Sequence, residues 1–174
     1  MFSSAGNYDS HRRSALHQGR RVECPMEDCG KHFVSIAAVF IHLESGACVS
    51  GVTVDDVARI AASVDRYDNV ITVDDARWIA DQVYDSLDRG SGWSGPWFEC
   101  PICDDEVPTS SHALRQHIRS VHPIFHCPPD FGCGKRFGTL SALCQHVESG
   151  QCDVCDERDE VDRVVDDVLR EVEA

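Results

Sequence analysis

Residues 127–152 read CPPDFGCGKRFGTLSALCQHVESGQC, and their cysteine and histidine spacing is the strongest indication of the fold. Its potential metal ligands follow the spacing C-x5-C-x12-H-x5-C and are Cys127, Cys133, His146 and Cys152. Thiolates and imidazoles are the ligands that zinc prefers, and a cysteine pair followed by two ligands on a helix is typical of a structural zinc site. The 12 residues between the pairs leave room for a strand, a turn and most of a helix. The stretch therefore predicts a small zinc-stabilised unit.

The same pattern occurs twice more along the chain. Residues 24–48 have the spacing C-x4-C-x12-H-x5-C, and residues 100–122 have C-x2-C-x13-H-x4-H. The predicted ligands are Cys24, Cys29, His42 and Cys48 in the first site, and Cys100, Cys103, His117 and His122 in the second. Phe33 and Phe137 each follow the second cysteine by four residues, whereas Val107 stands at that position in the middle unit. We predict three structural zinc ions.

Two short segments carry a family resemblance. Cys29-Gly-Lys-His-Phe33 and Cys133-Gly-Lys-Arg-Phe137 resemble the Cys-Gly-Lys-x-Phe segment of C2H2-type zinc fingers, a family that includes variants with Cys as the last ligand. Residues 42–48 (HLESGAC) and 146–152 (HVESGQC) are similar to the finger ends of many fungal proteins of this family. The resemblance implies ββα fingers at the three sites.

The remaining apolar patterns predict three amphipathic helices. Thr53-Val54-Asp55-Asp56 is typical of a capped helix start, and Val57, Ile60, Ala61 and Val64 then fall at helical spacing. A second copy begins at Thr72 and runs to Leu87. A stripe of valines from Val161 to Val172 predicts a helix in the tail. We expect that helix to dock on the 52–87 pair, or else to bind a partner.

These patterns predict a small α+β fold of three zinc-stabilised ββα fingers and three amphipathic helices, with short strands only. The expected divisions are a disordered N-terminus at 1–20, finger one at 21–50, a helical pair at 51–90, tandem fingers two and three at 96–152, and an acidic amphipathic helix at 153–174. Only four residues separate finger two from finger three, so we expect those two to pack as one unit.

Composition restricts the functional classes. The formal net charge is −14, and no run of 18 apolar residues predicts a membrane span. Residues 1–18 lack the apolar core of a secretory signal, so we expect an intracellular protein with reduced thiols, in the nucleus rather than the cytoplasm. Because the zinc sites consume the candidate Cys–His pairs, we expect no enzyme and no small-molecule substrate. Cys155 remains an alternative to Cys152 as the last ligand.

The expected partner is a protein. Zinc fingers that read DNA contact bases through helix positions −1, 3 and 6, counted so that the first ligand histidine is position 7. In the three units these positions are Ser35, Ala38 and Ile41, then Ser110, Ala113 and Gln116, then Thr139, Ala142 and Gln145. None is Arg, so the bidentate contact to guanine is missing. We expect Phe40, Ile41 and any undocked tail valines to face the partner. The alternative is a nucleic-acid-binding transcriptional regulator that uses Arg115, Arg119, Lys135 and Arg136.

Overall fold

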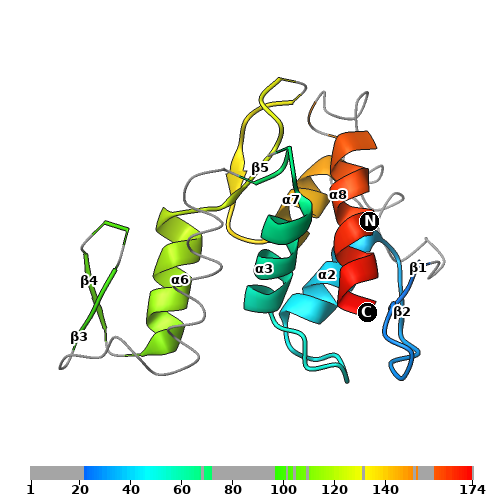
Figure 1. Ribbon diagram of the computed structural model, residues 1–174, viewed down its shortest axis with the longest axis horizontal. Coiled ribbons are helices and arrows are strands. Elements are labelled where there is room, and N and C mark those ends of the chain that lie inside the picture. Colours follow the sequence, from blue (N-terminus) through cyan, green and yellow to red (C-terminus); the bar gives the residue numbers. More distant parts are fainter. Residues whose placement is uncertain are drawn as a thin grey trace, which may run out of the picture.

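The chain forms a small α+β fold of helices and very short strands. The computed structural model describes residues 22–67, 69–71, 97–100, 102–103, 105–108, 110–130, 132–150, 152 and 159–173. Within these ranges lie five helices and three two-stranded antiparallel sheets (Figure 1). The predicted fold class is confirmed at this level. The expected disordered segment at 1–20 and the expected helix at 72–87 lie outside the described residues.

A two-stranded sheet followed by a helix occurs three times. The pairs are β1 (Val22–Glu23) with β2 (His32–Phe33), β3 (Trp97–Glu99) with β4 (Glu106–Pro108), and β5 (Phe125–His126) with β6 (Arg136–Phe137). The helices that follow are α2 (Ile36–Glu44), α6 (Ser111–Val121) and α7 (Leu140–Glu148). A hydroxyl group caps each helix, because Ser35, Ser110 and Thr139 each accept the backbone N–H three residues ahead.

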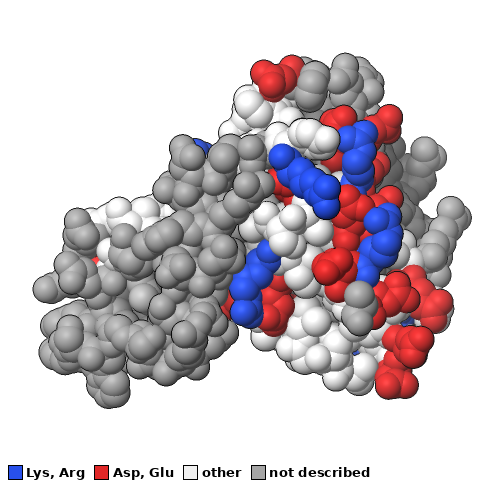
Figure 2. Space-filling model, viewed as in Figure 1, with Lys and Arg blue, Asp and Glu red and all other residues white. Residues whose placement is uncertain are grey.

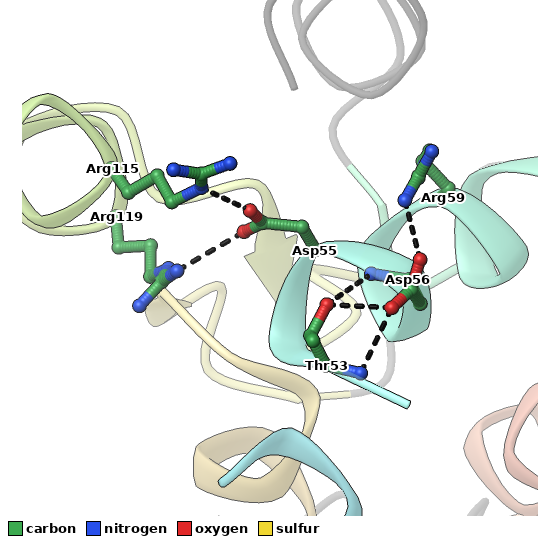
Figure 3. Close-up of polar contacts among 6 residues, drawn as sticks. All are labelled: Thr53, Asp55, Asp56, Arg59, Arg115 and Arg119. Carbon is green, nitrogen blue, oxygen red and sulfur yellow. Dashed lines mark hydrogen bonds and ion pairs between the residues drawn. The ribbon is translucent and has the colours of Figure 1, made fainter. Parts of the chain in front are cut away.

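Two further helices pack against each other. α3 (Val54–Val64) starts at the predicted cap: Thr53 and Asp56 form a capping box in which each side chain accepts the other's backbone N–H (Figure 3). α8 (Asp159–Glu173) lies along α3 and buries Val161, Val164, Val165 and Val168. The predicted docking of the tail helix on this region is confirmed for α3. Four tail valines are therefore covered within the chain, and Val172 is half-buried.

Two helices that lie far apart in the sequence pack against each other. α2 and α7 pack together near the middle of the molecule (Figure 1). Glu148, the last residue of α7, accepts the backbone N–H of Ala37 at 3.0 Å, and Glu44, the last residue of α2, accepts the backbone N–H of Ser141 at 3.1 Å. Because Ala37 and Ser141 are each the second residue of their helix, the two contacts are equivalent. α2 and α7 therefore form an antiparallel pair in which each helix caps the other.

Phe40 is fully buried in the hydrophobic core of the chain. Its exposed fraction is 0%, whereas that of Ile41 beside it is 45%. The expectation that both residues face a partner is therefore wrong for Phe40. A helix pattern shows that a residue lies on an apolar face, but it does not distinguish a face covered by a distant helix from a face left for another molecule.

The unit built around α6 is attached at two points. Asp55 on α3 is buried and forms ion pairs with Arg115 and Arg119 on α6, with 3.0 Å between Arg119 Nη2 and Asp55 Oδ1 (Figure 3). The backbone of Gly138, just after β6, passes so close to α6 that a Cβ there would lie 2.4 Å from the carbonyl oxygen of Arg119. The second and third units are therefore in direct contact through their backbones.

Candidate metal centres

The structure brings the predicted ligands together in three clusters. Within each cluster, the donor atoms lie within 4.8 Å of one another. The clusters are the first (Cys24, Cys29, His42, Cys48), the second (Cys100, Cys103, His117, His122) and the third (Cys127, Cys133, His146, Cys152). Each contains four donors from one sheet–helix unit and its flanking loops.

Distances between donor atoms match a tetrahedral ligand shell. With bonds of about 2.3 Å to sulfur and about 2.0 Å to nitrogen, two sulfurs lie about 3.8 Å apart, and a sulfur and a nitrogen about 3.5 Å apart. The Sγ–Sγ distances are 3.8 Å for Cys24–Cys48 and 3.7 Å for Cys127–Cys152. The Sγ–Nε2 distances are 3.3 Å for Cys29–His42, 3.3 Å for Cys103–His117, 3.6 Å for Cys100–His122 and 3.4 Å for Cys133–His146. These residues fit a zinc ion.

The segments HLESGAC and HVESGQC explain how the last cysteine reaches its cluster. Ser45 and Ser149 end their helices, and their hydroxyl groups donate to the carbonyl oxygens of His42 and His146 at 2.8 and 2.7 Å. The next residues, Gly46 and Gly150, have φ values of +68° and +64°, which glycine adopts without steric cost. The left-handed turn reverses the chain, so that the final cysteine returns to the metal side of the helix.

The phenylalanine after each Cys-Gly-Lys segment packs on a ligand histidine. The ring centroids are 4.9 Å apart for Phe33 and His42, and 5.1 Å apart for Phe137 and His146. Each contact fixes the plane of the imidazole ring, so that Nε2 points to the sulfur donors. The first and third units therefore share both their donor types and the aromatic residue that orients the histidine.

Burial favours the neutral forms of four ligands when no metal is bound. It raises the pKa of the Cys24 and Cys127 thiols to about 12. Burial, assisted by the positive charges of Lys31 and Lys135, lowers the pKa values of His42 and His146. Neutral imidazoles are ready to bind a cation, whereas the thiols must first release protons.

Cys144 and Cys155 are not among the residues of the three clusters. Cys144 is buried in the core on α7, as its apolar neighbours in the sequence suggest. Cys152 lies in the third cluster, whereas Cys155, the alternative ligand, lies outside the described residues. No helix among the described residues is long and apolar enough to cross a membrane.

Three acidic residues that have clear structural roles were not identified from the sequence. Glu44 and Glu148 join α2 to α7, and Asp55 joins α3 to α6. A signal for the glutamates is present, since both occupy the same position after the ligand histidine, where the second unit has Arg119. Asp55 resembles an ordinary acidic residue in the first turn of a helix and gives no such signal.

Comparison with known proteins gives no match: no protein-family model, no curated protein and no solved structure matches this chain.

Proposed function

We propose that this chain is a zinc-binding protein built from three ββα fingers of the C2H2 type, the first and third of which end on cysteine. The observation that carries the proposal is the agreement of six donor-atom distances, two in each cluster, with a tetrahedral zinc shell. The order of two strands and a helix in each unit supports the finger assignment. The resemblance of the two Cys-Gly-Lys-x-Phe segments points the same way.

The zinc ions act as structural centres. Four protein donors complete a tetrahedral shell, so no position is left for a catalytic water. Units of this size bury few apolar side chains, and metal binding supplies the missing folding free energy. The chain is accordingly proposed to be no enzyme.

Metal content and cobalt spectra test this part of the proposal. Elemental analysis of the purified chain should give three zinc ions per chain, and chelation should abolish the helical circular dichroism signal. After replacement by Co²⁺, the spectrum should show tetrahedral d–d bands. Cys29→Ala and Cys103→Ala should each remove one metal ion. A content of two ions or fewer, or octahedral cobalt spectra, would contradict three tetrahedral centres.

We further propose that the principal partner is a protein, in the nucleus rather than the cytoplasm. Reading a base requires donors on the exposed helix face, yet Ser35, Ser110 and Thr139 serve as helix caps. The second helix positions of α2 and α7, Ala37 and Ser141, are buried in the helix pair. These features limit the side chains that are free to contact bases.

The charge distribution of the chain also favours a protein partner over nucleic acid. Arg115 and Arg119, two of the four cations available to the nucleic-acid alternative, contact Asp55. Acidic side chains with interspersed Lys and Arg cover much of the visible described surface around α8 (Figure 2). Zinc bound by three thiolates leaves one negative charge at each of two sites, so the formal charge changes from −14 to about −16. A phosphate backbone is repelled by such a field.

Selection on random duplex DNA separates the two candidate functions. With the zinc-loaded chain, we expect no enriched sequence. Affinity purification should recover a protein that the wild type and Ile41→Val retain and Ile41→Asp loses, because Ile41 is an exposed apolar residue of α2. Enrichment of one DNA sequence, with an affinity that falls steeply with salt, would establish the transcriptional regulator instead.

A further inference from the structure

The first and third centres are chemically equivalent but differently enclosed. Both contain three cysteines and one histidine in the same order. In the first centre the exposed fractions are 3% for Cys24, 7% for His42 and 6% for Cys48. In the third centre Cys127 is buried, His146 and Cys152 are half-buried, and Cys133 is exposed. Cys29, the counterpart of Cys133, is half-buried.

Local structure accounts for the difference. In the first unit, Lys31 Nζ donates to the carbonyl oxygen of Ala47 at 3.3 Å, which ties the hairpin to the loop before Cys48. A β-bridge between Ser45 and Thr53 then holds the chain that follows the last ligand. The corresponding lysine of the third unit, Lys135, instead lies 5.7 Å from the centroid of the Phe137 ring. The third unit also has five rather than four residues between its first two cysteines.

We propose that the third centre is the exchangeable zinc site, and that Cys133 is the thiolate through which an electrophile or a zinc acceptor reaches the metal. This inference rests on the proposed zinc occupancy. Three thiolates around Zn²⁺ give the site a formal charge of −1, which leaves electron density on the sulfurs. The second centre has only two thiolates and is neutral. The first has three, of which Cys24 and Cys48 are buried and Cys29 is half-buried. Among the described ligands, only Cys133 is both exposed to solvent and part of a centre with a negative formal charge.

The reaction can be written with iodoacetamide as the probe. The Cys133 sulfur attacks the methylene carbon, a carbon–sulfur bond forms, and iodide leaves. The product is a neutral thioether, which binds zinc weakly. A competing chelator then removes the ion, and the remaining thiolates take up protons from solvent.

Limited alkylation of the full, zinc-loaded chain tests the inference. Zinc is counted first, so that fewer than three ions contradicts the proposed function rather than this ordering. A chromophoric chelator then reports zinc release while mass spectrometry maps the modified cysteines. We expect the first ion to leave in step with modification of Cys133, at least about tenfold faster than modification of Cys29, because thiolate reactivity follows exposure. Earlier modification of Cys29, Cys100 or Cys103, or release of all three ions together, would overturn it.

Matched variants at equivalent positions give a second readout. Cys133→His should abolish the rapid phase of zinc release, whereas Cys29→His should leave that phase in place. A rapid phase that persists in Cys133→His would contradict the inference. If either variant fails to fold, the map of modified cysteines in the wild-type chain still decides between the two sites.

Discussion

Glu148 accepts a hydrogen bond from the backbone N–H of Ala37 at 3.0 Å, so the last residue of α7 caps the first turn of a helix that lies 111 residues earlier in the chain. The equivalent contact from Glu44 to Ser141 makes the arrangement reciprocal. A carboxylate at a helix N-terminus satisfies an otherwise unpaired donor and interacts favourably with the helix dipole. The two outer zinc units are therefore joined by paired caps in addition to apolar packing.

Removing one cap should weaken the helix pair. Glu148→Ala should lower the free energy of unfolding by about 1 kcal/mol, the usual cost of losing a helix cap. Glu148→Gln is the control, because its amide oxygen still accepts the hydrogen bond. Urea denaturation of the zinc-loaded chain measures the difference, and hydrogen exchange at the Ala37 amide locates it. Equal stability of the alanine and glutamine variants would show that the cap contributes nothing.

Phe40 and Ile41 provide a matched pair on the same turn of α2. Phe40→Ala should destabilise the chain by about 3–5 kcal/mol, because it removes a fully buried aromatic side chain. Ile41→Ala should cost less than about 1 kcal/mol, because nearly half of that side chain is exposed. Thermal or urea unfolding of both variants gives the comparison. Similar costs at the two positions would contradict the full burial of Phe40.

Asp55 should be required to hold α6 in place. Asp55→Asn removes the carboxylate that pairs with Arg115 and Arg119 in a partly buried site, and breaking such a contact costs about 3 kcal/mol. Asp166→Asn, on the exposed face of α8, is the control and should change little. Unfolding by urea measures stability, and filter binding measures affinity for non-specific DNA. Because Asp55→Asn removes a negative charge beside two arginines, DNA affinity should rise in this variant, and an unchanged stability would show that the contact is unimportant.

Gly138 should tolerate no side chain. Gly138→Ala places a Cβ against the Arg119 carbonyl and should cost about 1–3 kcal/mol by overpacking. Gly30→Ala is the comparison, because its Cβ meets nothing within 4 Å and only its positive φ opposes the change. Chemical-shift mapping should show changes on α6 for Gly138→Ala and changes confined to the first unit for Gly30→Ala. No response on α6 would contradict the close backbone contact.

Zinc binding should release protons in a countable way. Burial raises the pKa of Cys24 and Cys127, so these thiols are protonated at neutral pH without metal. Free thiols are mostly protonated at neutral pH, so filling three sites that contain eight cysteine ligands should release about four to eight protons at pH 7. Affinity for zinc should rise with pH and fall in acid, because protons compete with the metal for the sulfurs. Titration in a weakly buffered indicator solution counts the protons, and a release of three or fewer would contradict thiolate ligation at three sites.

The sequence alone determined the local chemistry of this protein. The spacing of Cys and His selected the members of each cluster, and the Thr53 cap and the valine stripe located α3 and α8, because ligand spacing, caps and helical periodicity are properties of short segments. Only the tertiary structure decided which faces meet. Phe40 and Ile41 look alike as neighbouring apolar residues, and Asp55 looks like any acid in a first helical turn. The role of Asp55 depends on α6, which approaches from far along the chain. The burial of Phe40 depends on tertiary packing, because a local pattern shows that a face is apolar without identifying what covers it.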